Sequence, residues 1–418
     1  MDLLIQNARM GPDMRDVLIQ DGRFARIEPR IDPAALASPP QVLDADGLAL
    51  LPSFANAHCH AAMVLFRGLG DDTPLHEWLN QVIWPMERRL TADQIYWGTL
   101  FGCQEMIRAG ITAVLDMYWQ TPQCLRAIYE SGLRGCFCHP NILPPGPESL
   151  AALQHDLEEH LALAKSYPAR VELAIGIHAL YTTQPAMRAI CRDFAAEHDL
   201  LVHAHVSETR RETDECIQAT GKTPVELLAS EGLLNNRFIG AHGVWLTDRD
   251  RQLLRDHQAA IVHCPSSNMK LASGAFDEPA ARRAGLRLGL GSDGAATNNR
   301  YDLFSEMRTA ALLAKVSSGD PTAGPAAGLY RAATRDGFRI LRLDAGEIAV
   351  GRLADCILVN LDDSGLVPGH NLVSDLVYAA TPECVDTTIC AGNVLMRQRR
   401  IPGEDEVRQA VREAAARL

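Results

Sequence analysis

The sequence has 418 residues, of which 47% are apolar and 22% are charged, a composition typical of a folded enzyme rather than a disordered or fibrous chain. Its net charge of -12 is spread along the chain, which excludes nucleic acid and anionic membranes as the expected partners. The 11 cysteines are scattered and the first residues lack the pattern of a signal peptide, so we expect reduced thiols in a cytoplasmic protein.

Strand patterns occupy both ends of the chain. Residues 1–51 contain β-favouring runs at 3–8 and 16–27, and such runs return at 351–360 and 387–396. Between them, short apolar runs alternate with longer helical stretches, as in repeated β-α units. We therefore predict an α/β fold, with a (β/α)8 TIM-like barrel over 52–345 and a flanking β-sandwich domain that residues 1–51 and 346–418 form together.

Six of the apolar runs in the middle region end in a histidine or an aspartate. In a (β/α)8 barrel, catalytic groups gather at the carboxyl ends of the strands. Packing alone does not explain six such endings, so we expect the site at that end of the barrel. The six residues are Asp116, His178, His205, His242, His263 and Asp293.

The first of the middle strands carries His58 and His60. Side chains at i and i+2 of a strand point to the same side, so the two imidazoles converge. With His205 and Asp293 they would give three imidazoles and one carboxylate, a suitable set for one divalent metal ion, zinc first and iron or manganese as alternatives. His203 faces the same way as His205, and the spacing does not decide which of them is the ligand.

Two further residues are candidates for proton transfer. Glu208 follows His205 at the strand exit, where its carboxyl group can reach a substrate proton, and His242 can hydrogen-bond the attacking water. Taken singly, they would be an ordinary loop acid and a buried structural histidine. We expect one metal rather than two, because a bridging carbamylated lysine before His205 could come only from Lys165, which lies in a helical stretch.

Five ordered motifs resemble the amidohydrolase superfamily, in its branch of mononuclear aminohydrolases and chlorohydrolases. They lie at residues 52–60, 203–208, 241–243, 263–268 and 291–294. Within that branch, the stretches at 65–72, 84–87, 221–226, 268–274 and 293–299 are most similar to 5'-methylthioadenosine/S-adenosylhomocysteine deaminases. The resemblance spans the whole chain. It implies a metal-dependent hydrolase that removes the 6-amino group of adenine-type nucleosides as ammonia.

The same resemblance implies roles for the candidate residues. His58, His60, His205 and Asp293 would bind the metal, and Glu208 would protonate N1 of the purine. Asp293 would also handle the attacking water, together with the histidine at position 242.

Four residues are implied to bind the substrate. Glu87 would accept hydrogen bonds from the ribose hydroxyls, His178 would contact the base, and Trp84 and His139 would lie beside the substrate. Relatives that accept S-adenosylhomocysteine place arginines after the third strand, whereas positions 135–169 of this chain contain none. We therefore expect 5'-methylthioadenosine and adenosine as substrates before S-adenosylhomocysteine, because no bidentate clamp for its carboxylate is evident.

Two alternatives stay open. One keeps the chemistry and changes the ring, giving a guanine, pterin or s-triazine aminohydrolase or a chlorohydrolase. The other, which the set of ligands and acids disfavours, is a non-catalytic barrel that serves as a binding module. The expected partner is a small purine nucleoside, and we expect a homo-oligomer because members of this branch commonly form one.

Overall fold

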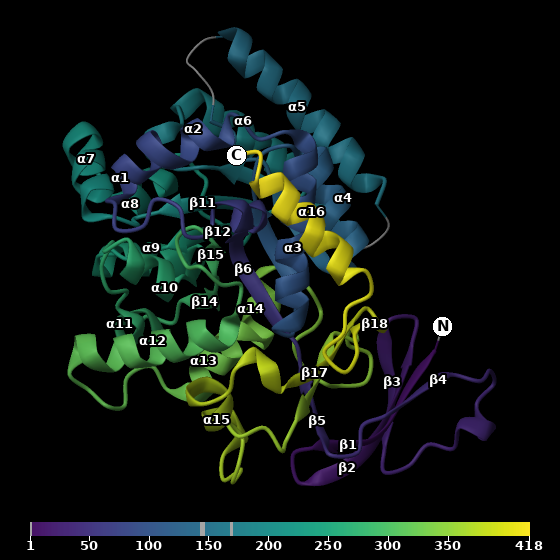
Figure 1. The fold of residues 1–418 in the computed structure, drawn as a ribbon. Coiled ribbons are helices and arrows are strands. Elements are labelled where there is room, and N and C mark those ends of the chain that lie inside the picture. Colours follow the sequence, from purple (N-terminus) through teal and green to yellow (C-terminus); the bar gives the residue numbers. More distant parts are fainter. Residues whose placement is uncertain (1, 143–146, 168–169) are drawn as a thin grey trace.

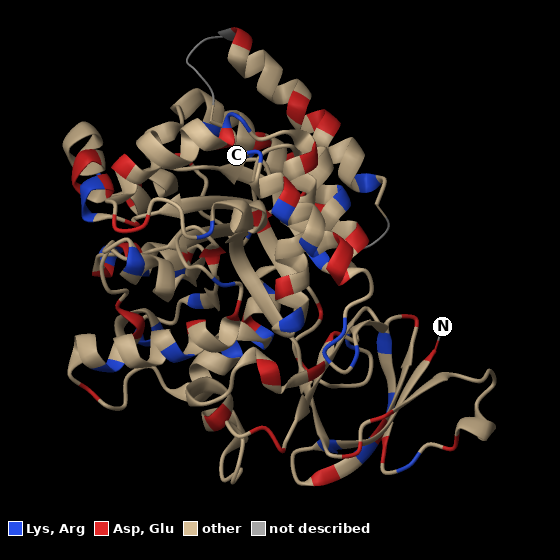
Figure 2. Ribbon diagram, viewed as in Figure 1, with Lys and Arg blue, Asp and Glu red and all other residues tan. Residues whose placement is uncertain are grey.

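The computed structural model describes residues 2–142, 147–167 and 170–418. Figure 1 shows a large body of helices around parallel strands and, beside it, a sheet to which N-terminal and C-terminal segments both contribute, while the C-terminus itself lies on the large body at the end of α16 (Glu404–Ala415). In the view of Figure 2, acidic and basic residues are scattered over helices and loops without forming one face of a single sign. Within the described residues, no helix is long and apolar enough to cross a membrane.

The parallel strands form two five-stranded sheets, in the orders β15-β6-β7-β8-β9 and β10-β11-β12-β13-β14. Ala174 alone separates β9 from β10, and residues 291–292 separate β14 from β15, so the chain carries each sheet into the other. Every neighbouring pair is parallel, and the strands follow one another around a barrel. Their bounds are β6 Phe54–His60, β7 Ile111–Met117, β8 Arg134–Cys138, β9 Val171–Leu173, β10 Ile175–Ile177, β11 Val202–Val206, β12 Phe238–His242, β13 Ala260–His263, β14 Arg287–Leu290 and β15 Asp293–Gly294.

Helices cover the outside of this barrel (Figure 1). Strands covered on both faces read as continuous apolar runs, and β7 and β13 are indeed buried at every residue. Three of the helices, α3, α8 and α9, begin at a capping box, in which the hydroxyls of Thr91, Thr223 and Thr247 each accept a backbone N–H. The bounds are α3 Ala92–Arg108, α4 Thr121–Ser131, α5 Pro147–Lys165, α6 Pro185–Glu197, α7 Arg210–Thr220, α8 Pro224–Ser230, α9 Asp248–Asp256, α10 Pro265–Lys270, α11 Glu278–Arg283, α12 Leu303–Ser318, α13 Ala326–Ala333 and α14 Arg335–Ile340.

Short helical turns lie between β6 and α3, where a regular barrel would have one loop. They run from the carboxyl end of the first barrel strand, and one of them is a π-helical turn. A further short turn follows β10. The bounds are η2 Ala61–Phe66, α1 Leu75–Glu77, η3 Trp78–Ile83, α2 Trp84–Glu87 and, after β10, η4 Leu180–Thr182.

N-terminal and C-terminal segments together form one eight-stranded sheet, in the order β18-β17-β16-β5-β1-β2-β3 with β4 paired to β1. The two ends meet where β5 pairs antiparallel with β16, with Leu51 opposite Ile357. Because β5 also pairs with β1, the pairing gives this single sheet where the sequence predicted a sandwich of two. The bounds are β1 Leu3–Met10, β2 Asp13–Gln20, β3 Arg23–Glu28, β4 Gln41–Asp44, β5 Leu48–Pro52, β16 Cys356–Asn360, β17 Val385–Cys390 and β18 Asn393–Met396, with short turns η1 Pro33–Ala35 and η5 Pro382–Cys384.

Two helices of the C-terminal segment pack on the barrel rather than on this sheet. Helix α15 (Leu372–Tyr378) lies against α12 and α13, and α16 (Glu404–Ala415) lies against α3. The amide of Gln94 on α3 donates to the carbonyl of Ala414 at 2.9 Å. Residues after 346 therefore both complete the terminal sheet and cover part of the barrel.

Candidate active site

A pocket of about 640 Å³, part of which is open solvent, lies at the carboxyl ends of the barrel strands. The ends of β6, β7, β11, β12 and β15 contribute side chains to it, which is how a (β/α)8 barrel builds a site from residues far apart in the sequence. His58 lies beneath the pocket and is fully buried. The predicted site residues that line the pocket are His60, Trp84, Glu87, His178, His205, Glu208, His242 and Asp293.

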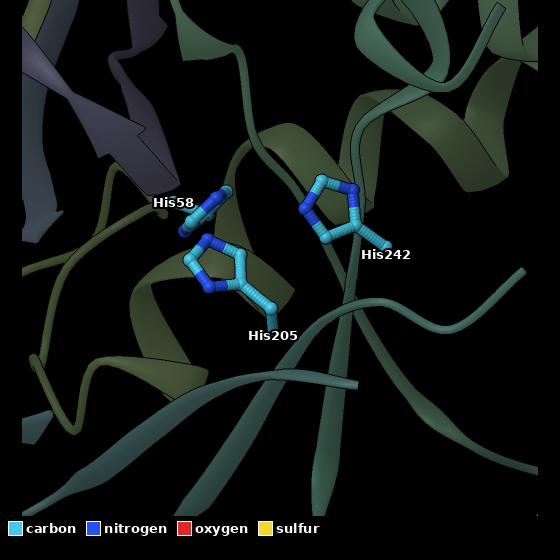
Figure 3. Close-up of side chains that lie close together, drawn as sticks. All are labelled: His58, His205 and His242. Carbon is cyan, nitrogen blue, oxygen red and sulfur yellow. The ribbon is translucent and has the colours of Figure 1, made fainter. Parts of the chain in front are cut away.

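Three imidazole nitrogens and one carboxylate oxygen converge on the floor of this pocket. Asp293 Oδ1 lies 3.3 Å from His58 Nε2 and 3.2 Å from His60 Nε2, and the latter lies 3.3 Å from His205 Nε2. In Figure 3 the rings of His58, His205 and His242 lie close together, with the His58 ring roughly perpendicular to the other two. Strands β6, β11 and β15 thus bring together the four residues that were predicted to bind a metal.

Backbone carbonyls fix the tautomers of two of these histidines. His60 Nδ1 lies 2.6 Å from the carbonyl oxygen of Met117, and His205 Nδ1 lies 2.7 Å from that of His178. A carbonyl only accepts hydrogen bonds, so each neutral ring carries its proton on Nδ1 and presents the lone pair of Nε2 to its neighbour. When both rings are neutral, the two facing lone pairs repel each other, and a cation bound by both would remove that repulsion.

The tautomer of His58 is fixed through a second histidine. His203 Nδ1 donates to the carbonyl of Ile239 at 3.0 Å, so His203 Nε2 accepts from His58 Nδ1 at 2.8 Å. Within the described residues, His58 Nε2 is a buried nitrogen without a hydrogen-bond partner, and it faces the cluster. Of the two histidines that the sequence could not separate, His205 belongs to the cluster and His203 supports it from behind.

The protonation states of the cluster suit a metal site. Burial lowers the pKa of His58 to about 4 and that of His205 well below its usual range, which keeps both rings neutral. Burial also acts to lower the pKa of His60, but the hydrogen bond and charge of Asp293 outweigh it and raise that pKa to about 9, so without a cation this ring holds a second proton, which a bound metal would displace. Neutral imidazole nitrogens and a carboxylate oxygen are the donors that zinc takes from proteins, so these residues fit one divalent ion.

The second oxygen of Asp293 is anchored away from the cluster. Oδ2 accepts hydrogen bonds from Ser267 Oγ at 2.5 Å and from Thr297 Oγ1 at 3.1 Å. Burial acts to raise the pKa of this carboxyl group, but the neighbouring rings of His58 and His60 outweigh it and hold that pKa well below its usual range. Asp293 also adopts a φ of 60°, a left-handed conformation that non-glycine residues reach mainly where the surroundings impose it.

Glu208 and His242 face each other beside the cluster. Glu208 is buried, with Oε2 3.8 Å from His242 Nε2, and its Oε1 lies 3.5 Å from the donor Ser273 Oγ. His242 Nδ1 pairs with Asn268 Oδ1 at 2.8 Å, which turns Nε2 toward Glu208. Burial raises the pKa of Glu208, so this carboxyl group holds a proton to higher pH than a solvated glutamate and suits a proton donor.

The outer part of the pocket is apolar. Its wall comes from the short turns α1, η3 and α2, and the last residue of α2, Glu87, accepts a hydrogen bond on Oε2 from Trp119 Nε1 at 3.1 Å. Burial raises the pKa of Glu87. No lysine or arginine occurs among the described residues that line the pocket. The wall consists of Leu75, Trp78, Leu79, Ile83 and Trp84, with Leu271 added from the loop after α10.

Some predicted residues lie outside the pocket lining. His139 packs edge-on against the ring of Trp119, with the centroids 5.2 Å apart, because the next residue, Pro140, takes the lining position. Asp116 accepts the backbone N–H of Ala61 at 2.7 Å and so supports the chain just after the first strand. His263 stacks on Phe276 at 4.6 Å and is a packing residue.

Most of the apolar wall was not predicted from the sequence. Of its members only Trp84 was predicted, and Trp119, which holds Glu87, was not. The signal was present as a dense run of large apolar residues at 75–84. Such a run is read as core until the structure shows that it faces a pocket.

Comparison with known proteins gives consistent results. The model of the amidohydrolase family matches residues 49–395. A 5'-deoxyadenosine deaminase from Methanothermobacter thermautotrophicus is 41% identical, covering 98% of this chain and 97% of its own. A 5-methylthioadenosine/S-adenosylhomocysteine deaminase from Thermococcus kodakarensis is also 41% identical, over 95% of this chain and 94% of its own. Among solved structures, an adenosine deaminase from Xanthomonas campestris with bound zinc has a TM-score of 0.91 and 31% identity, covering 100% of this chain and 98% of its own.

Proposed function

The chain belongs to the amidohydrolase family, and on that premise we propose that it is a metal-dependent hydrolase that deaminates adenine-type nucleosides. The observation that carries the proposal is the convergence of His58, His60, His205 and Asp293 on one point, with Glu208 beside them. Three similar proteins are named as deaminases of adenine nucleosides, which supports adenine as the ring of the substrate.

The proposed reaction adds water to C6 of the purine and expels its amino group. When bound, a divalent metal would supply an activated water at the strand ends. Asp293 accepts a proton from that water, and His242 Nε2 orients it. Glu208 protonates N1, which makes C6 more electrophilic. Asp293 then passes its proton to the departing amino group, and the C6–N bond breaks. The hydroxyl proton left at C6 returns to Glu208, and the products are the inosine-type nucleoside and ammonia.

The outer pocket supports a ribosyl substrate with a neutral 5' group. Glu87, held by the indole of Trp119, would accept hydrogen bonds from ribose hydroxyls, and Trp84 and His178, whose ring centroids lie 6.4 Å apart, would flank the base. The apolar wall and the three acids of the pocket favour an uncharged 5' substituent over a carboxylate. We therefore propose 5'-methylthioadenosine, 5'-deoxyadenosine and adenosine as the substrate class, with S-adenosylhomocysteine a poorer substrate.

Three further points belong to the same proposal. Zinc is the metal we propose, because the donor set is neutral imidazole and carboxylate and the similar deaminase from Xanthomonas campestris holds it. Residues 1–51 and 346–418 are proposed to form one small domain and residues 52–345 the barrel. A homo-oligomer stays our prediction for the assembly.

The test is ammonia release by the zinc-loaded protein from a panel of amino compounds, before and after removal of the metal by a chelator. The panel contains 5'-methylthioadenosine, 5'-deoxyadenosine, adenosine, S-adenosylhomocysteine, guanine and melamine. We expect turnover of the first three, loss of it on chelation, and a decrease of about 10²–10⁴-fold in kcat for Glu208→Gln. Activity confined to guanine or melamine would leave the metal chemistry standing and overturn the assignment of the ring. The absence of any turnover would favour a binding module.

A further inference from the structure

Glu212 is a buried acid next to the site that the proposed reaction does not use. It lies in the first turn of α7, and its side chain turns back toward the end of β11. Its two carboxylate oxygens accept the backbone N–H groups of two successive residues, Oε1 that of Ser207 at 3.1 Å and Oε2 that of Glu208 at 2.8 Å. Glu212 thus holds the main chain at the position of the proposed proton donor.

The backbone at this point is a strained turn that is held from both sides. Ser207 has a φ of 50°, in the left-handed region that costs a non-glycine residue free energy. On one side, the N–H of Gly243 donates to the carbonyl of Val206 at 3.0 Å, and the N–H of Trp245 donates to that of Ser207 at 2.9 Å. These bonds occupy the carbonyls of the turn and leave its amide groups to Glu212.

The contacts of Glu212 depart from those of an ordinary helix cap. In a capping box the third helical residue reaches back to the N–H of the N-cap, as Glu226 does to Thr223 at 3.0 Å at the start of α8. Glu212 occupies the equivalent position after the N-cap Thr209, but its side chain passes the cap and binds residues 207 and 208 instead. The cap of α7 uses only the backbone N–H of Glu212, so the carboxylate serves the turn rather than the helix.

We propose that Glu212 is a positioning residue for Glu208, fixing its main chain so that its carboxyl group faces His242 and the pocket. This role rests on the proposed function, because it acts through the proton that Glu208 delivers. Without the carboxylate, two buried N–H groups lose their acceptors, and the strained turn relaxes. A displacement of about 1 Å at a reacting group is enough to lower a rate about 100-fold.

The test is a double-mutant cycle on the zinc-loaded protein, with 5'-methylthioadenosine as the substrate. Glu212→Gln keeps the shape of the side chain, but its amide can accept only one of the two N–H groups. We expect this variant to lower kcat about 10–100-fold while KM and bound zinc stay unchanged. In the Glu208→Gln background the same substitution should change kcat less than about threefold, because the group it positions no longer donates a proton.

Glu226→Gln is the matched control, since it removes a glutamate that accepts a backbone N–H at the next helix, outside the pocket. It should leave kcat unchanged. If Glu212→Gln does not fold, Glu212→Asp replaces it in the cycle, because it keeps the charge and shortens the reach. Equal losses of kcat with and without Glu208 would overturn the positioning role alone. A wild-type protein that deaminates no nucleoside would overturn the proposed function, and this role with it.

Discussion

The inner and outer parts of the pocket are built in different ways. Strand ends carry the inner part, and hydrogen bonds hold its polar groups: His60 and His205 are bound to backbone carbonyls, and Asp293 to two hydroxyls. The outer part is a wall of large apolar side chains on three consecutive short turns, α1, η3 and α2. Its one described polar anchor across the pocket is the bond between Trp119 and Glu87.

The difference separates the reaction from the choice of substrate. Fixed tautomers and an anchored carboxylate suit steps in which charge and protons move, because groups that are already oriented need no rearrangement. Apolar contacts of the outer wall add binding energy in proportion to the buried area and discriminate mainly by size and charge. Substitutions in the inner part should therefore lower kcat or metal content, whereas those in the outer wall should raise KM.

The largest effect is expected for Asp293→Ala. It removes the carboxylate that faces both His58 and His60, so we expect loss of bound metal and a decrease in kcat of at least about 10⁴-fold. Metal analysis of the purified variant and a deamination assay check both parts. Asp277→Ala, which removes an exposed helix cap far from the pocket, is the control. A variant of Asp293 that keeps both metal and full turnover would contradict the proposed role.

His203→Phe tests the support behind the cluster. The change leaves every proposed ligand in place but removes the acceptor that keeps the proton of His58 on Nδ1. We expect metal affinity to fall by about 10–100-fold, with turnover restored by excess zinc. His257→Phe, an exposed histidine after α9, serves as the control. Titration with a competing chelator measures the affinity, and an unchanged value would show that the tautomer needs no support.

Trp84→Ala should separate the outer wall from the inner part. The loss of this ring should raise KM for 5'-methylthioadenosine about tenfold, the equivalent of roughly 1.4 kcal/mol of apolar contact, while kcat changes little. Trp97→Ala is matched to it, because Trp97 packs on Tyr96 outside the pocket. Steady-state kinetics decide the matter: if kcat falls and KM does not, the division between the two parts is wrong.

The smallest effect on activity is expected for Glu306→Gln, behind the inner part. Glu306 is fully buried and accepts the N–H of Ser266 at 3.1 Å and the amide of Asn298 at 2.9 Å; burial raises its pKa to about 8. The folded state keeps this proton between pH 4.5 and about 8 while the unfolded state releases it. This contribution to stability is therefore full below pH 4.5 and is lost as the pH rises.

The free energy of unfolding should accordingly fall with pH by up to about 1.4 kcal/mol per unit within that interval, from this group alone. Glu306→Gln should remove that contribution, and Glu413→Gln, on the exposed face of α16, should not. Urea unfolding at pH 6 and pH 8 measures the difference. The same slope in both variants would show that Glu306 is ionised in the folded protein.

Much of the inner part could be predicted from the sequence, because strand periodicity places His58 and His60 on one side and parallel strands meet at one end of a barrel. The choice between His203 and His205 could not be made from spacing, since both face the same way. It depends on carbonyls of other strands, Ile239 for the one and His178 for the other. Contacts of that kind follow only from the register of neighbouring strands.

The outer wall and the terminal sheet show where sequence patterns stop. Trp78 and Leu79 are large apolar residues of the kind found in a core, and only their position above the strand ends makes them pocket residues. Likewise, β16 lies within a predicted strand whereas β5 was not predicted as one, and their direct pairing into one sheet depends on contacts about 300 residues apart in the chain. For Glu212, the helix can be recognised from the sequence, but the reach of its side chain past the helix cap cannot.

The most direct test of the central claim is the fate of oxygen when 5'-methylthioadenosine is turned over in ¹⁸O-labelled water. Hydrolytic deamination predicts one labelled oxygen on C6 of the purine in the nucleoside product and one ammonia released for each product molecule. Neither product should form when the metal is removed. Free adenine as the product, or an unlabelled nucleoside, would contradict the claim that this site adds water at C6.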